Sequence, residues 1–222
     1  MAARPLHERP GWTSVTNEAA HPLAALEGRE LAKGRLRVHL GPRSRFGARY
    51  FVALLDRGGE MTPVLMALHN SGPLPGYNWV EVAETNEPLA GDDGVAQLFA
   101  LLLEVLPAGG HLMVEYDSPQ RAETAQALAR GVPAIATPLG SLLFGLGFGA
   151  KFKDWQIAEG GSEGPRKLQA YKPSGDEHTR RWRDEAAADL RAFLSRDIRD
   201  GSDPVLEARE RARGVLKRLE HG

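Results

Sequence analysis

Apolar and polar residues alternate along several stretches of the first half of the chain. This pattern predicts a strand with one solvent-facing side at 35–40, and apolar runs predict two further strands at 50–55 and 64–68. Residues 56–59 read Asp-Arg-Gly-Gly, a turn that joins these two further strands into a hairpin. With an extended segment at 79–82, these stretches predict an antiparallel meander.

Two further segments show helical spacing of apolar residues. A weak edge strand at 12–16 is followed by a predicted helix over 20–31, which ends at Gly34. The second helix carries apolar residues from Val95 to Leu106 and stops before a proline.

The organising stretch of the chain begins at a short apolar run, Leu112 to Val114, between two turns. Such a run is typical of a strand buried on both faces. A helix over 120–130 follows it, capped by Ser118 and stopped at a glycine, and a second short helix starts at Thr137. An antiparallel pair then closes the unit, with strands at 152–157 and 168–171.

Residues 174–222 are charged, show no strand pattern and predict two amphipathic helices. We therefore expect an α/β domain over 1–173 and a helical appendage over 174–222. The two helices either cover one face of the domain or form a homodimer contact.

Composition narrows the function classes. The 222 residues carry a net charge of −1, which does not favour a nucleic-acid partner. No apolar run approaches the ~20 residues needed to span a bilayer, so we expect a cytoplasmic protein without a membrane partner. Cysteine is absent, which excludes disulfides and thiol catalysis. His39, His69 and His111 each stand alone along the sequence, so no metal site is expected.

The element order, together with Gly-Gly-His-Leu-Met-Val-Glu-Tyr, Thr-Pro-Leu-Gly, Lys-Asp-Trp and Lys-Leu-Gln-Ala-Tyr-Lys-Pro, resembles an uncharacterised prokaryotic family, domain of unknown function 1122. Over 12–173 the order also resembles the GNAT-type N-acetyltransferase fold, a mixed α/β sheet with an antiparallel N-terminal meander. The resemblance to acetyltransferases implies transfer of an acyl group from acetyl-coenzyme A to an amine on a small molecule.

In acetyltransferases a glycine-rich loop at a helix start holds the coenzyme A pyrophosphate, and the matching residues here are Gly91, Gly94 and Val95. The basic residue of that loop is missing. Asp92 and Asp93 stand in its place, where they suit the helix dipole and would repel a pyrophosphate.

The same resemblance implies that Glu81 deprotonates the amine and that Tyr116 protonates the leaving thiolate, with Asp117 beside them. These last two residues follow Glu115 at the carboxyl end of the central strand, where open α/β sheets often bind ligands. Each has a plain structural explanation as well, in packing or in ending the strand.

The closing strands add Asp154 and Trp155 as candidate substrate-binding residues, although a solvated strand face with cross-strand ion pairs explains them equally well. Two other functions stay open. One is a non-catalytic binding or scaffold protein that kept the fold and lost the cofactor loop. The other is a methyltransferase-like protein that uses S-adenosylmethionine, which would need an early parallel strand before a glycine-rich loop.

Overall fold

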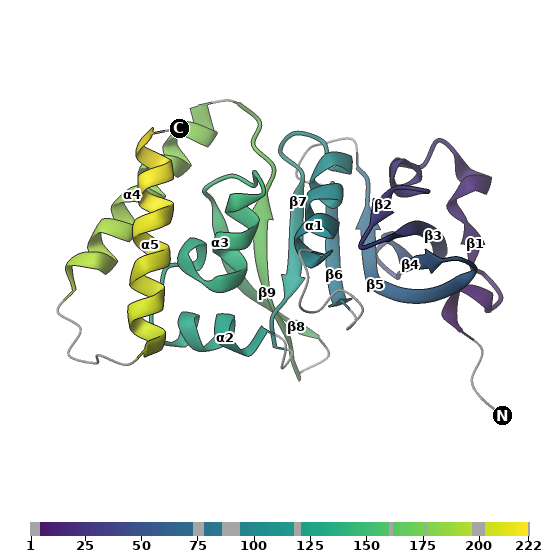
Figure 1. Ribbon diagram of the computed structural model, residues 1–222, viewed down its shortest axis with the longest axis horizontal. Helices are drawn as coiled ribbons and strands as arrows, with labels where there is room; N and C mark the ends of the chain where they lie inside the picture. Colours follow the sequence, from purple (N-terminus) through teal and green to yellow (C-terminus); the bar gives the residue numbers. More distant parts are fainter. Residues whose placement is uncertain are drawn as a thin grey trace. The chain divides into compact units, whose positions relative to one another are not determined.

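Strands and helices combine in a mixed α/β architecture in the computed structural model, as the sequence predicts. The chain divides into two compact units, Met1–Leu112 (unit 1) and Met113–Gly222 (unit 2), and Figure 1 traces both. The structure describes residues 5–72, 78–85, 94–117, 121–159, 162–175, 177–196 and 203–221, without the side chains of 83–85, 155, 157–159, 162–164, 203 and 204.

Antiparallel pairing joins the strands of unit 1. The order across them is β1, β3, β4, β5, β6, with β2 paired to β3. Their bounds are β1 Thr13–Ser14, β2 Glu30–Leu31, β3 Gly34–Arg43, β4 Arg49–Arg57, β5 Glu60–Asn70 and β6 Trp79–Thr85. The predicted antiparallel meander is therefore confirmed.

The predicted hairpin turn between β4 and β5 is also confirmed. Gly58 and Gly59 have φ angles of +68° and +97°, which residues with a side chain rarely adopt. The Asp56 carboxylate accepts a hydrogen bond of 2.9 Å from the Gly59 backbone N–H. The turn thus follows from local chemistry that the sequence displays.

The predicted helix over 20–31 is wrong. The segment forms one short 3-10 helix, η3 (Pro22–Leu26), and then enters β2; another 3-10 helix, η2 (Val15–Glu18), precedes it. Pro22 is at the first position of η3, where it donates no N–H, and Gly28 has a φ of +73° that breaks any continuing helix. Leu23 and Leu26 are fully buried, so the apolar spacing reflects packing by a tighter helix.

Helix α1 (Gly94–Val105) matches its prediction and ends before Pro107. Leu98, Phe99 and Leu102 are fully buried, and the helix contacts η3 and β2 within unit 1. This contact brings the N-terminal end of α1 next to the β2–β3 turn, which positions the site described below.

The predicted central strand is β7 (His111–Glu115), and its residues Leu112 and Val114 are fully buried, as expected. The division between the two units falls within this strand. In unit 2, β9 (Ser162–Tyr171) lies between β7 and β8 (Phe152–Glu159), and β8 pairs antiparallel with β9. The closing antiparallel pair is confirmed.

The two helices predicted after the central strand are α2 (Ala122–Ala129) and α3 (Pro138–Gly145). Thr137 caps α3 by accepting a hydrogen bond of 3.0 Å from the Gly140 N–H. Gly131, with a φ of +73°, ends α2. The predicted cap of α2, Ser118, lies outside the described residues.

The tail forms the two expected helices, α4 (Glu177–Ser195) and α5 (Asp203–His221), which lie side by side in Figure 1. They share one apolar cluster with α2 and with η7 (Ala134–Ala136). The cluster includes Ala127, Val132, Ile135, Ala136, Ala186, Leu190, Phe193, Ala208, Ala212 and Val215. Within unit 2 the tail helices thus cover a neighbouring apolar face, which is the first of the two interpretations of the tail. The domain boundary and the homodimer contact stay predictions.

Candidate functional site

A cavity of about 1050 Å³ lies in unit 1 where the β2–β3 turn meets the first turn of α1. Among the lining residues that the structure describes, Lys33, Arg35 and Arg57 are basic and Glu30 is acidic. The helix contributes Gly94, a buried residue at its start. Positive side chains therefore surround a helix N-terminus, the arrangement that binds phosphate groups in many proteins.

The turn that carries Lys33 has an unusual backbone. Ala32 and Lys33 have φ angles of 45° and 63°, a left-handed pair that normally contains asparagine and glycine. The next residue, Gly34, has no room for a side chain, because an added Cβ would stand 2.7 Å from Leu55 and 2.9 Å from the Asp56 carbonyl oxygen. Strained non-glycine residues cost about 1–3 kcal/mol each and gather at functional sites.

The turn is held in place by two hydrogen bonds. Arg57 donates to the Ala32 carbonyl at 2.9 Å, and Gln97 of α1 accepts from the Ala32 N–H at 3.5 Å. The side chains of Lys33 and Arg35 are exposed and have no hydrogen bond or ion pair to any residue that the structure describes. Their charges are thus available to a ligand in the cavity.

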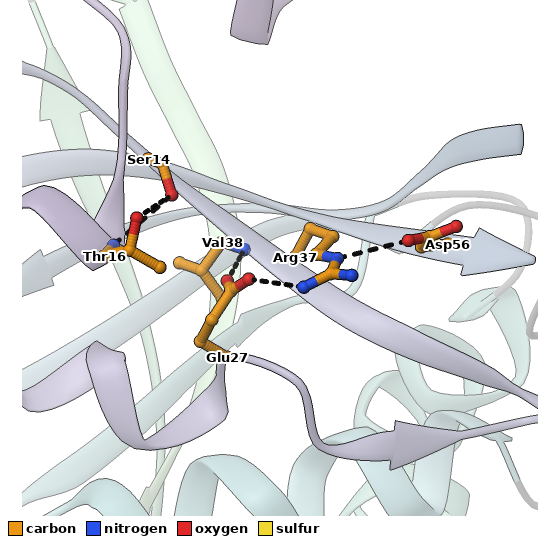
Figure 2. A network of polar contacts seen from close by, with 6 residues as sticks. All are labelled: Ser14, Thr16, Glu27, Arg37, Val38 and Asp56. Carbon is orange, nitrogen blue, oxygen red and sulfur yellow. Dashed lines mark hydrogen bonds and ion pairs between the residues drawn. The ribbon is translucent and has the colours of Figure 1, made fainter. Parts of the chain in front are cut away.

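A neighbouring arginine of β3 is already neutralised, as Figure 2 shows. Arg37 lies 3.2 Å from a Glu27 carboxylate oxygen and 3.2 Å from Asp56. Glu27 also accepts a 2.7 Å hydrogen bond from the Val38 N–H. This network fastens the segment after η3 to the strand, so Arg37 has a structural role that Arg35 lacks.

The contacts of this network shift the pKa of Asp56 and that of Arg37. The hydrogen bond from the Gly59 N–H and then the one from the Arg37 guanidinium lower the pKa of Asp56, and the hydrogen bonds that Arg37 donates to Glu27 and Asp56 raise the pKa of Arg37. Both ions stay charged over the ordinary pH range, which keeps the network intact.

In unit 2, the predicted residues at the end of β7 do meet. The Tyr116 hydroxyl donates to Asp154, and Arg166 donates to the other oxygen of Asp154 at 2.7 Å. The Asp117 carboxylate accepts from the Arg166 backbone N–H at 2.7 Å. Tyr116 is fully buried. Its pKa is raised, first by burial and second by the hydrogen bond to Asp154.

Glu115 lies at the edge of the same cluster. Its backbone oxygen accepts from Arg121 at 2.7 Å, and its carboxylate is 3.9 Å from the Lys167 ammonium. Burial lowers the pKa of Arg121, and the Glu115 charge partly restores it. The cluster therefore has matched charges, as a structural network would.

The remaining predicted residues lie elsewhere. Glu81 is half-buried on β6 in unit 1, opposite Leu68, while Val95 is half-buried in the first turn of α1. Gly91, Asp92 and Asp93 lie outside the described residues. Trp155 pairs with Lys167 on β8 and β9, and its side chain is not among those described.

The basic residues of the unit 1 cavity were not predicted from the sequence. The alternation over 35–40 identified a solvent-facing side that includes Arg35, but nothing in it showed that α1 begins beside this side. The helix start is about 60 positions from Lys33 and Arg35 and about 40 from Arg57 along the chain, so only the fold brings them together.

The fold also pairs histidines that stand apart along the sequence. The rings of His21 and His69 are 5.1 Å apart, and those of His7 and His39 are 5.3 Å apart. Within the described part of the chain, no three His, Asp or Glu side chains form a group suited to a metal ion. None of the helices in that part is long and apolar enough to cross a membrane.

Comparisons with known proteins place the chain in a family. The family model described as "Protein of unknown function (DUF1122)" matches residues 33–197, and the chain belongs to this family. A crystal structure of a protein of unknown function from Aquifex aeolicus VF5 is similar, with 27% identity and a TM-score of 0.65. The match covers 93% of this chain and 98% of that one. No curated protein matches the chain.

Proposed function

We propose that this protein is an N-acyltransferase-like enzyme that holds the phosphate groups of its acyl donor, acetyl-coenzyme A, in the unit 1 cavity. One observation carries the proposal: Lys33, Arg35 and Arg57 surround a cavity of about 1050 Å³ at the start of α1. A pyrophosphate there meets both the positive end of a helix and cationic side chains.

The basic residues answer the objection raised by the glycine-rich loop. That loop lacks a cation of its own, but Lys33 and Arg35 supply two from the β2–β3 hairpin. The cavity volume exceeds the 300–1000 Å³ or so of common ligand pockets, which suits a donor as large as a nucleotide thioester. The basic side chains and the volume of the cavity both fit the phosphate end of acetyl-coenzyme A.

Acyl transfer to an amine requires two proton movements. The amine nitrogen bonds to the acyl carbon as the carbon–sulfur bond breaks, so one proton leaves nitrogen and one reaches the departing sulfur. We assign removal of the first to Glu81, directly or through water, and delivery of the second to Tyr116. Glu115, Asp117, Asp154 and Trp155 are the candidate acceptor-binding residues.

A non-catalytic binding protein is the second candidate, and the environment of Tyr116 favours it. The phenol is buried and donates to Asp154, and its raised pKa weakens it as a proton donor. The methyltransferase alternative receives no such support, because the early strands of unit 1 pair antiparallel.

Calorimetric titration with acetyl-coenzyme A tests the binding step. A separate titration with S-adenosylmethionine tests the methyltransferase alternative. The Lys33→Glu, Arg35→Glu double variant reverses two cavity charges and should weaken acetyl-coenzyme A binding at least tenfold. Lys153→Glu, an exposed lysine of unit 2, is the matched control and should bind normally. Equal binding by both variants would refute the site.

Thiol release separates the enzyme from the binding protein. The chain contains no cysteine, so a thiol reagent detects released coenzyme A without background from the protein. An enzyme should release thiol only when an amine from a test panel is present, and Glu81→Gln should slow the release while leaving donor affinity unchanged. Binding without thiol release across the panel would support the non-catalytic alternative.

A further inference from the structure

Unit 2 contains a second basic cavity, of about 470 Å³, between α3 and α5. From α3 it is lined by Ser141 and Gly145, which are four residues apart. From α5 it is lined by Arg211, Gly214 and Arg218, at spacings of three and four. These spacings place each set on one helix face, with small residues on the floor and an arginine at each end.

Arg218 is the clearest sign of a ligand. Its guanidinium lies over α3, with Nη1 3.2 Å from the position that a Cβ on Gly145 would occupy. It forms no hydrogen bond or ion pair with the residues that the structure describes, whereas Arg183 and Arg191 donate to Leu219 and Glu220. A cation in the last turn of α5 also suits the helix dipole, but the dipole does not explain a glycine under the guanidinium.

Arg211 marks the other end of the cavity. Its Nε donates to the Ala136 carbonyl at 3.3 Å, and it lies 3.5 Å from Glu207 one turn earlier. It is seven positions before Arg218, which corresponds to about 10 Å along the helix axis. An apolar wall lies between the two ends, formed by Pro138, Leu142, Leu146 and Val215.

We propose that this cavity binds a small organic anion with an apolar body, such as an aliphatic or aromatic carboxylate or sulfonate. The Arg218 guanidinium attracts the anionic head, and the apolar wall holds the body. No acidic side chain is among the described lining residues, and the Glu207 partner of Arg211 lies outside this set. The volume is that of an ordinary small-molecule pocket. This site is independent of the function proposed for unit 1.

Gly214 provides a sharp test because it keeps the cavity open. A Cβ built on it meets no atom within 4 Å, so a larger residue there fills space without a clash. Glycine is also a poor residue inside a helix, and replacing it favours the helix. Gly214→Leu should therefore block the cavity while the melting temperature stays equal or rises.

The probe is 8-anilinonaphthalene-1-sulfonate, with octanoate as competitor, followed by fluorescence on the full chain. Gly214→Leu and Arg218→Gln should each weaken probe binding at least tenfold, and octanoate should displace the probe from the natural protein. Arg213→Gln is the control, an exposed arginine on the same helix that does not line the cavity, and should bind normally.

Unchanged affinity in both cavity variants would overturn the proposal. An equal loss in Arg213→Gln would also overturn it, because the probe would then be responding to surface charge alone. If Gly214→Leu lowers the melting temperature, Arg218→Gln decides the outcome by itself, since its side chain is exposed and makes no contact that the fold needs.

Discussion

The hydroxyl of Tyr116 donates a hydrogen bond to the Asp154 carboxylate and thereby ties the end of β7 to β8. The other Asp154 oxygen receives Arg166, whose guanidinium lies 5.4 Å from the centre of the Tyr116 ring. Tyr116 is fully buried, and Asp154 is about one-third exposed, with a side-chain exposure of 30%. The phenol thus reaches a carboxylate that is still partly hydrated.

This relationship predicts a measurable coupling between the two residues. Tyr116→Phe should lower the free energy of unfolding by about 1–2 kcal/mol, because one hydrogen bond to a charged group is lost. Asp154→Ala should cost at least as much, since it leaves a buried hydroxyl unpaired. Urea unfolding of the single and double variants gives the coupling energy, and strict additivity would contradict the hydrogen bond.

The central strand predicts a large effect of a buried charge. Val114 is fully buried on β7, so Val114→Asp should lower the free energy of unfolding by about 4 kcal/mol or leave the protein insoluble. Lys153→Asp places the same side chain at an exposed position of β8 and should change stability by less than about 0.5 kcal/mol. Similar melting temperatures for the two variants would remove β7 from the core.

Removal of the tail tests how far α4 and α5 act as an appendage. These helices share their apolar cluster with α2 and η7, so truncation after Pro173 exposes Ala127, Ile135 and Ala136 to solvent. We expect a shortened chain with a lower melting temperature and increased binding of a hydrophobic dye. A truncated chain that unfolds cooperatively at an unchanged temperature would show instead that residues 1–173 are an independent domain.

Local patterns predict local structure well in this chain. The β4–β5 hairpin follows from Asp56, Gly58 and Gly59, and the cap of α3 follows from Thr137, because each depends on residues a few positions apart. The segment over 20–31 shows the limit: its apolar spacing suits an α-helix, but Pro22 and Gly28 divide it into shorter elements.

Sites assembled from distant parts of the chain are harder to predict. The sequence indicates Tyr116, Asp117 and Asp154 because they lie at or near predicted strands, and the fold brings them together. For Arg35 the sequence indicates only a solvated strand face, and its place beside the start of α1 depends on packing of α1 against η3 and β2. Sequence spacing carries no information about such contacts.

The buried histidines predict how stability depends on pH. His69 and His111 are each 7% exposed, and burial lowers the pKa of each to about 4. For His69 the neighbouring His21 contributes as well. Both side chains are therefore neutral in the folded protein at neutral pH.

Whether acid stabilises or destabilises the protein depends on which state, folded or unfolded, binds more protons. An unfolded histidine takes up its proton near pH 6.5, while the folded ones take it up only near pH 4. Between these values the unfolded chain holds more protons, so acid favours unfolding. Each histidine can lower the free energy of unfolding by up to about 1.4 kcal/mol per pH unit in this window.

Chemical denaturation at pH 7, 6, 5 and 4.5 checks this expectation. The free energy of unfolding should fall steadily below pH 6.5 in the natural protein. His69→Gln should be less stable at pH 7, because it changes a packed site, and its stability should depend less steeply on pH, since one protonation difference is gone. His111→Gln should reduce the slope by a similar amount, and the double variant by the sum. Slopes that match the natural protein in all three variants would mean that other groups, the carboxylates first among them, govern acid unfolding.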